Sequence, residues 1–167
     1  FSVPAIISGN GVILKHASNV QGCANAIESC FYEAGFPKDL FRNLAVIGKN
    51  VSKVIEDPMI KAVTITGSTP AGKAVAEAAG RVLKKTVLEL GGSDPYLILD
   101  DADIDSALEA SILGRILNTG QSCIAAKRII VTEKIHNKFL DKLEEKLNEK
   151  IMGDPLDDVD IGPMVSI

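Results

Sequence analysis

Residues 62–72 read Ala-Val-Thr-Ile-Thr-Gly-Ser-Thr-Pro-Ala-Gly, a pattern typical of a strand-to-helix junction in an α/β fold. The β-branched run Ala62–Ile65 predicts a strand that leads directly into a glycine turn, and helix-forming residues follow from Ala71 to Leu83. In a parallel sheet such a junction binds phosphates, because free N–H groups and the positive end of the helix dipole lie there. The spacing is not G-x-G-x-x-G, so the turn alone fits a plain connection equally well.

Three residues of this turn are candidate contacts to a phosphate. Gly67 permits close approach of the backbone, Ser68 supplies a hydroxyl donor, and Gly72 closes the glycine-bounded segment. Pro70 suits the first turn of the helix, where a missing N–H costs nothing.

Strand and helix patterns alternate along most of the chain. Further strands are expected at Gly11–Lys15, Leu44–Gly48, Thr86–Leu90, Tyr96–Leu99 and Arg128–Val131. Helices are expected from Asn19 to Ala34, from Asn50 to Ile55, after the acidic turn Asp100–Asp105 to about Leu117, and from Ile135 to Ile151. This order predicts an α/β fold with a parallel sheet and flanking helices. The pair Gly91-Gly92 is the candidate boundary between two parts.

Composition excludes several classes of partner. The chain has 167 residues, of which 46% are hydrophobic, and its net charge is −4 with no basic block. Nucleic acid is therefore not expected as a partner, because phosphate binding needs a concentrated positive surface. No apolar stretch approaches the ~20 residues of a spanning helix, so no membrane association is expected.

The three cysteines are expected to have different roles. Cys23 and Cys30 lie seven residues apart on a predicted helix and are expected to be small apolar fillers on its buried face. Cys123 lies in a polar, glycine-containing loop, where a nucleophilic thiol and a half-buried loop cysteine are equally plausible. An odd count without pairing fits a reducing compartment, which predicts a cytoplasmic location.

Glu89 stands near the end of the predicted strand Thr86–Leu90. Alternation could simply turn it to solvent, but active sites of parallel sheets lie at the carboxyl ends of strands. Partial burial would raise the pKa of Glu89 toward the range of a general base. His16 and His136 have no partners at metal-ligand spacing, so no metal site is expected.

Taken together, these segments resemble the aldehyde dehydrogenase superfamily, and most closely its succinate-semialdehyde dehydrogenase branch. Branches that act on glyceraldehyde or lactaldehyde are similar. The segments that carry the resemblance are Val12-Ile-Leu-Lys-His-Ala-Ser18, Glu33-Ala-Gly-Phe-Pro37, Ile65-Thr-Gly-Ser-Thr69, Leu88-Glu-Leu-Gly-Gly92, Leu99-Asp-Asp-Ala-Asp103, Asn118-Thr-Gly-Gln-Ser-Cys123, Gly153-Asp-Pro155 and Ile161-Gly-Pro163.

The resemblance implies a Rossmann-like fold and NAD(P)-dependent oxidation of a small aldehyde to a carboxylic acid. It implies that Cys123 is the nucleophile and Glu89 the general base. The candidate cofactor-binding residues are then Lys15, Ser18, Thr66, Gly67, Ser68, Gly72 and Leu90.

The choice between NADP and NAD depends on Ser18. The resemblance implies that NAD-preferring members carry Glu at this position, where it bonds the ribose 2′-hydroxyl. Ser18 removes that charge, and Lys15 could pair with a 2′-phosphate, so NADP is expected to be accepted.

The resemblance also predicts that the family's chain continues beyond both ends of this one, as the absence of an initial Met suggests. Residues 1–90 are then the later part of the dinucleotide-binding domain, and residues 91–167 open the catalytic domain. The parent enzyme is expected to be a homo-oligomer, a dimer or tetramer, and the 167 residues alone are expected to be inactive. The alternatives are a coenzyme A-acylating dehydrogenase and a non-catalytic nucleotide-binding module.

Overall fold

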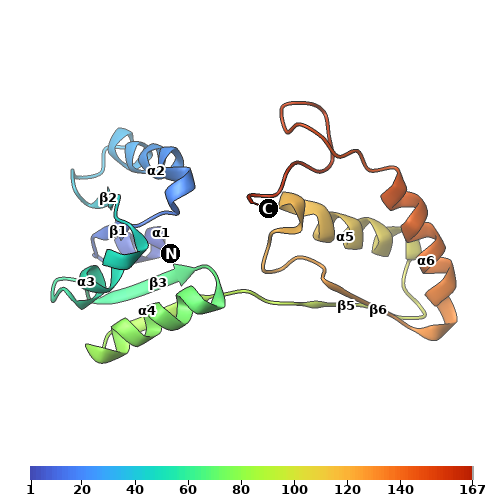
Figure 1. The fold of residues 1–167 in the computed structure, drawn as a ribbon, viewed down its shortest axis with the longest axis horizontal. Coiled ribbons are helices and arrows are strands. Elements are labelled where there is room, and N and C mark those ends of the chain that lie inside the picture. The colour runs from blue at the N-terminus through green and yellow to red at the C-terminus, as the bar shows by residue number, and fades with distance from the viewer. Residues whose placement is uncertain (167) are drawn as a thin grey trace. The chain divides into compact units, whose positions relative to one another are not determined.

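The computed structural model describes residues 1–166, which form two compact units. The first unit is Phe1–Glu89, and the second runs from Leu90 to the C-terminus. In both units parallel strands alternate with helices, which confirms the predicted α/β class (Figure 1).

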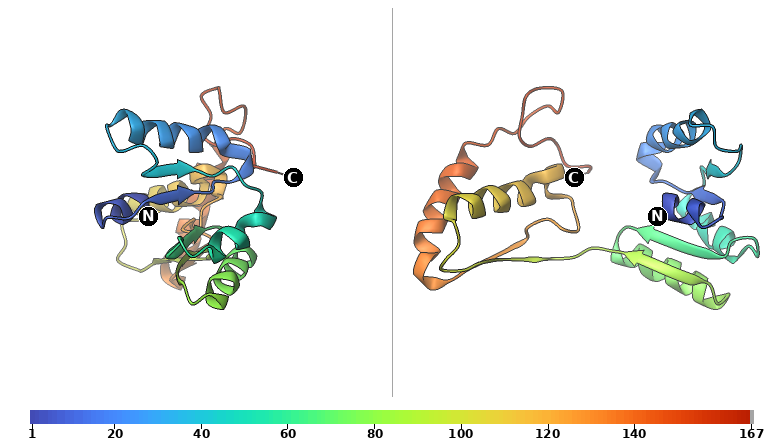
Figure 2. Two further views of the ribbon diagram at one scale, coloured as in Figure 1. Left: turned by 90° about the vertical axis from the view of Figure 1, so that its left-hand side faces the viewer. Right: turned by 180° about the vertical axis from the view of Figure 1, so that it is seen from behind.

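The first unit contains two parallel ladders. Strand β1 pairs with β2, and β3 pairs with β4, whose arrows run side by side in Figure 2. The elements, with short 3₁₀ turns at Ser18–Val20 and Gly48–Asn50, are α1 (Ser2–Ile7), β1 (Val12–Leu14), α2 (Gln21–Glu33), β2 (Phe41–Asn43), α3 (Val51–Glu56), β3 (Ala62–Thr66), α4 (Thr69–Arg81) and β4 (Lys85–Glu89).

The second unit contains one parallel ladder, in which β5 pairs with β6. Helices α5 and α6 contact each other, and α6 also contacts β6. The elements are β5 (Pro95–Ile98), α5 (Ile104–Ile116), a 3₁₀ segment at Leu117–Gly120, β6 (Arg128–Val131) and α6 (Glu133–Asn148).

Near the N-terminus one predicted strand is misplaced and one helix was missed. The strand expected at Leu44–Gly48 lies at Phe41–Asn43 instead, because β1 offers partners only as far as Leu14, which pairs with Asn43. Helix α1 was not among the predicted elements. Pro4 lies in the first turn of that helix, where the absent N–H has no partner to lose.

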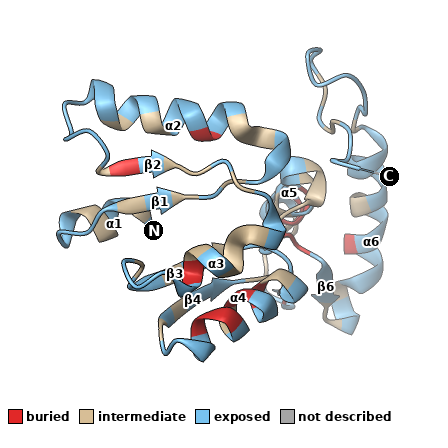
Figure 3. Cartoon of the chain, turned by 60° about the vertical axis from the view of Figure 1, so that its left-hand side comes forward, coloured by how far each residue is buried: buried red, intermediate tan, exposed pale blue. Residues whose placement is uncertain are grey.

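Helix α4 covers the β3–β4 ladder with one apolar face. Its buried residues recur at helical spacing and appear red in Figure 3: Gly72, Val75, Ala78 and Ala79. Val75, Ala78 and Ala79 pack with Ile55 of α3, and the partly buried side chains packed against this core include Val63 and Ile65 of β3. The alternation of β3 thus turns Val63 and Ile65 toward the helix.

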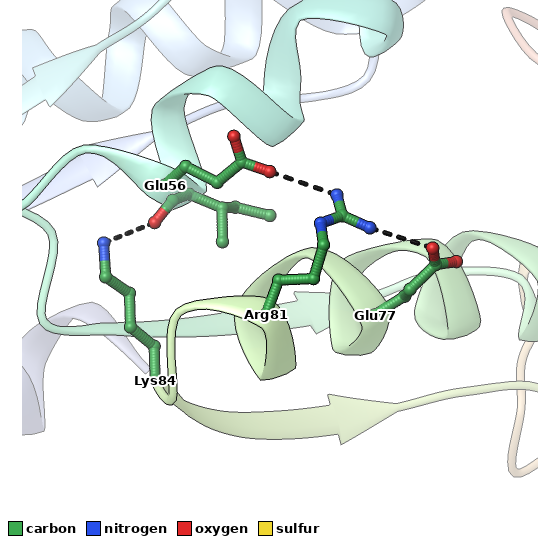
Figure 4. Close-up of polar contacts among 5 residues, drawn as sticks. Glu56, Glu77, Arg81 and Lys84 are labelled. Carbon is green, nitrogen blue, oxygen red and sulfur yellow. Dashed lines mark hydrogen bonds and ion pairs between the residues drawn. The ribbon is translucent and has the colours of Figure 1, made fainter.

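Polar contacts hold α3 against the C-terminal half of α4 (Figure 4). Arg81 bonds Glu56 of α3 at 3.1 Å and Glu77 of its own helix at 2.8 Å. The ammonium of Lys84 donates to the carbonyl oxygens of Ile55 and Asp57, where α3 ends. The charged groups of Arg81 and its partners are well exposed, so they fix the relative orientation of the helices more than they add stability.

Cys23 and Cys30 are exposed, so the prediction that they fill a buried face was wrong. The face of α2 that meets β2 carries Ala24, Glu28 and Phe31 instead. Ala24 is fully buried, the ring of Phe31 stacks on that of Phe41 at 4.6 Å, and a Glu28 oxygen accepts the Asn43 N–H at 2.8 Å. The cysteines lie on the neighbouring stripe of the helix, which these contacts leave uncovered.

The core of the second unit is built around Phe139 of α6. This ring is 1% exposed and packs with Ile98 of β5 and Leu108 of α5. Helix α5 begins at the N-cap Asp103, whose carboxylate accepts the Ser106 N–H at 2.8 Å. The hydrogen bond from the Ser106 backbone, and to a lesser extent that from its side chain, holds the pKa of Asp103 below its ordinary value.

This cap predicts an acid-sensitive contribution to stability. Because the pKa of Asp103 is lowered by folding, its contribution is complete above about pH 4, the range of an unfolded Asp, and is lost as the pH falls through the folded pKa. Asp103→Asn keeps a capping oxygen but does not titrate. We expect the thermal midpoint of this variant, measured in the full-length protein, to fall less steeply below pH 4 than that of wild type.

The control for this experiment is Asp101→Asn, a neighbouring exposed carboxylate. Its midpoint should follow the wild-type pH profile. Identical acid profiles for the Asp103→Asn protein and wild type would contradict the assignment.

Candidate active site

The loop that carries Cys123 has an unusual backbone. Asn118, Thr119 and Gly120 follow one another with φ values of 52°, 58° and 71°. A left-handed conformation is rare for a β-branched residue such as Thr119, and such strain concentrates at functional sites. At Gly120 a Cβ would lie 2.4 Å from the Arg115 Nη1 atom and 2.8 Å from the Arg115 carbonyl oxygen, so only glycine fits there.

Side chains of this loop bond its own backbone and a later segment. The Gln121 amide donates to the Asn118 carbonyl oxygen at 3.1 Å and accepts the Val165 N–H at 3.1 Å. The Thr119 hydroxyl donates to the Gly162 carbonyl oxygen at 3.3 Å. Residues 162–165 therefore brace the strained turn that precedes Cys123.

The chain beyond Cys123 is anchored under α5. Ala125 and Ala126 are each 1% exposed, and the Ala126 N–H donates to the Gly114 carbonyl oxygen at 3.0 Å. Cys123 itself is exposed. An accessible thiol on a fixed loop can serve as a nucleophile once its thiolate forms.

A hollow of about 880 Å³ lies beside the loop, between α5, α6 and residues 155–163. Asn118, Thr119 and Gln121 line its edge, but Cys123 does not. We therefore do not assign this hollow to the site of Cys123.

In the first unit, the β3–β4 register brings Glu89 beside the glycine turn. Thr66 and Glu89 are partners in the parallel ladder, and the Gly67 N–H donates to the Glu89 carbonyl oxygen at 3.0 Å. Ser68 is the N-cap of α4, where its hydroxyl oxygen accepts the Ala71 N–H at 3.3 Å. The structure thus groups Thr66, Gly67 and Ser68 with the candidate base.

Two expectations about these residues need correction. Glu89 is exposed, so burial does not activate its carboxylate within this chain. Gly72 is buried inside α4, and its N–H already donates to the Ser68 carbonyl oxygen at 2.9 Å. Gly72 can therefore contribute packing under the turn but no bond to a phosphate.

The other candidate cofactor residues lie elsewhere. Lys15 directly follows β1, Ser18 begins the first 3₁₀ turn, and both are exposed. Leu90 and Cys123 belong to the second unit. The structure therefore brings Glu89 together with the Thr66–Ser68 turn, whereas Lys15 and Ser18 follow a strand of the other ladder.

The turn at the start of α4 fits a dinucleotide phosphate. Residues 66–70 are all exposed, and the helix behind them is 13 residues long, so its dipole favours an anion at this end. Pro70 has no N–H to offer, which leaves the amides of Ser68 and Thr69 as available donors.

Within residues 1–166, no cluster of three or more potential ligands could hold a metal ion. None of the helices in this range is long and apolar enough to cross a membrane.

The sequence reasoning missed the left-handed turn before Cys123. Asn118 and Gly120 are residue types that adopt this conformation readily, and they were the available signal. Thr119 gave no such signal, because its conformation depends on bonds to residues far along the chain.

Comparison with known proteins decides the family. A model of the aldehyde dehydrogenase family matches residues 2–167. The chain belongs to this family. Among curated relatives, a probable NADP⁺ succinate-semialdehyde dehydrogenase of Synechocystis sp. is 48% identical over 99% of this chain and 37% of its own length. The chain spans about a third of such relatives.

Solved structures agree with this assignment. Succinic semialdehyde dehydrogenase from Streptococcus pyogenes, solved in complex with NADP⁺, has a TM-score of 0.89 and 40% identity over 94% of this chain and 34% of that one. Lactaldehyde dehydrogenase from Escherichia coli has a TM-score of 0.93 and 30% identity, covering 99% of this chain and 35% of that one.

Gly120 provides a test of the strained loop. Gly120→Ala forces a Cβ into contact with Arg115 at a positive φ, so we expect a loss of about 2 kcal/mol in the free energy of unfolding. Deuterium exchange of the amides in residues 118–126 should rise at the same time. Denaturant unfolding and exchange mass spectrometry of the full-length protein measure these effects.

The matched control is Gly80→Ala on α4, where nothing lies within 4 Å of the added Cβ. A helical Ala is favoured over Gly, so this variant should gain about 0.5–1 kcal/mol. A Gly120→Ala protein as stable as the Gly80→Ala protein would contradict the loop geometry.

Proposed function

We propose that the protein containing this chain is an NADP-dependent aldehyde dehydrogenase that produces a carboxylic acid, with succinate semialdehyde as its first candidate substrate. The observation that carries the proposal is the exposed Cys123 on a strained, hydrogen-bonded loop, in a chain of the aldehyde dehydrogenase family. The names of similar relatives support both the cofactor and the substrate.

In the proposed reaction, the Cys123 thiolate attacks the aldehyde carbon and forms a C–S bond, which gives a thiohemiacetal. NADP⁺, when bound, would supply the acceptor for the hydride that leaves the former aldehyde carbon, so that a thioester remains on Cys123. Glu89 then takes a proton from water as the water oxygen attacks the thioester carbon. The C–S bond breaks, Cys123 leaves as a thiolate, and the acid is released.

The chain's own residues would hold the cofactor at two places. The exposed turn Thr66–Ser68 would receive the pyrophosphate at the start of α4, and Leu90 would contribute its backbone. Lys15 would pair with a 2′-phosphate, which Ser18 does not repel. Residues 1–90 would then form part of the cofactor domain and residues 91–167 part of the catalytic domain.

A cytoplasmic location is part of this proposal, supported by the three free cysteines among the described residues. The homo-oligomer and the inactivity of the isolated 167 residues stay predictions from the resemblance.

Cys123→Ser is the direct test in the full-length protein. A serine hydroxyl without an activating base is a far weaker nucleophile than a thiolate, so NADPH formation from succinate semialdehyde should fall by about 10³-fold or more. Cys23→Ser and Cys30→Ser are matched controls, since both thiols are also exposed, and each should keep its activity within about twofold.

Activity that survives in the Cys123→Ser protein would contradict the proposal. The product separates two classes of dehydrogenase: free succinate without added coenzyme A supports hydrolysis assisted by Glu89. A strict requirement for coenzyme A would indicate the acylating class instead.

Cofactor choice provides a second test, at Ser18. Ser18→Glu places a carboxylate near the expected 2′-phosphate, and repulsion of about 1–3 kcal/mol should move the NADP/NAD ratio of kcat/KM toward NAD by ten- to a hundredfold. Steady-state kinetics with both cofactors measure the ratio. Ser29→Glu, an exposed position on α2, should leave the ratio unchanged.

Equal ratios in the Ser18→Glu and Ser29→Glu proteins would show that Ser18 does not lie near the ribose.

A further inference from the structure

We propose that Lys127 is a positioning residue that fixes the backbone of Cys123, an inference that rests on the proposed role of Cys123 as nucleophile. The Lys127 ammonium donates to three backbone carbonyl oxygens: Gly92 at 2.6 Å, Ser122 at 2.9 Å and Cys123 at 3.2 Å. An ammonium has three N–H donors, and here each has a carbonyl partner.

Two of these carbonyls determine how Cys123 is held. The Ser122 and Cys123 oxygens belong to the two peptide groups on either side of the Cys123 Cα atom. One cation that bonds both restricts rotation on each side of that atom, so it sets the direction of the Cα–Cβ bond that carries the thiol. Hydrogen bonds from a charged donor are stronger than neutral ones, which suits this restraint.

The third carbonyl ties the loop to the start of β5. β5 and β6 are parallel, and their first residues, Pro95 and Arg128, are paired. The segments that precede the two strands therefore lie at the same end of the ladder. Gly92 lies in one such segment and Lys127 in the other. Lys127 therefore joins the Cys123 loop to the segment that leads into β5.

Two further contacts agree with this joint. A Cβ at Gly92 would lie only 3.4 Å from the Cys123 carbonyl oxygen, so the two backbones already pack closely. The next residue, Arg128, donates through its Nε atom to the Ser93 carbonyl oxygen at 2.9 Å. Consecutive cations at the start of β6 thus bind consecutive carbonyls before β5.

Lys127→Met in the full-length protein tests this role, because methionine keeps most of the chain length but donates no hydrogen bond. We expect kcat to fall by about 10²-fold, the cost of misplacing a reacting group by about 1 Å. The Kd for NADP should stay within twofold, and the far-UV circular dichroism should not change. Deuterium exchange should rise in residues 118–126 and in the segment around Gly92, and not elsewhere in the chain.

Two more variants make the result specific. Lys127→Arg retains a charged donor and should recover kcat to within about fivefold of wild type. Lys138→Met removes an exposed lysine of α6 in the same unit and should leave kcat unchanged.

A Lys127→Met protein with kcat within twofold of wild type would overturn the proposal. So would an unfolded protein, a parallel loss of NADP binding, or an Arg variant as impaired as the Met variant, since each would assign Lys127 to general stability. The Cys123→Ser protein separates the two levels. If it stays active, the proposed function fails; if it is inactive while Lys127→Met is fully active, only the role of Lys127 fails.

Discussion

The parallel pairing of neighbouring strands is the constraint on which both units depend. A parallel pair needs a crossover connection, because the chain must return to the end of the sheet where the first strand began before the second strand can start. In the first unit α4 provides that crossover between β3 and β4, and its small buried residues allow it to lie close to the ladder. In the second unit α5 and the Cys123 loop provide it between β5 and β6.

These two crossovers place their candidate residues differently. In the first unit Thr66 and Glu89 are ladder partners at the carboxyl ends of their strands, where open parallel sheets bind ligands. Cys123 instead precedes β6, at the amino end of its ladder, and Gly92 precedes β5 at the same end. The candidate nucleophile is therefore held by loop hydrogen bonds rather than by strand register.

The Cys123 loop combines strain with many polar restraints. Of the three consecutive left-handed residues, Thr119 is the one whose conformation is costly, and the surrounding bonds must offset that strain. Those bonds come from Thr119 and Gln121 on one side of Cys123 and from Lys127 on the other. A loop held in this way loses little further freedom when a substrate reacts with its thiol.

The alternation of strands and helices could be predicted from the sequence, since hydrophobic periodicity and the residues of the turns are local properties of the chain. The sequence also predicted that a helix follows the acidic turn Asp100–Asp105 and that Pro70 lies in the first turn of a helix, because both signals depend on neighbouring residues. Three features came only from the tertiary structure. They are the register that pairs Glu89 with Thr66, the exposure of Cys23 and Cys30, and the carbonyl oxygens that Lys127 bonds. Each depends on partners distant in sequence, and a lysine in a loop has the same local pattern whether it faces solvent or bonds a residue 35 positions away.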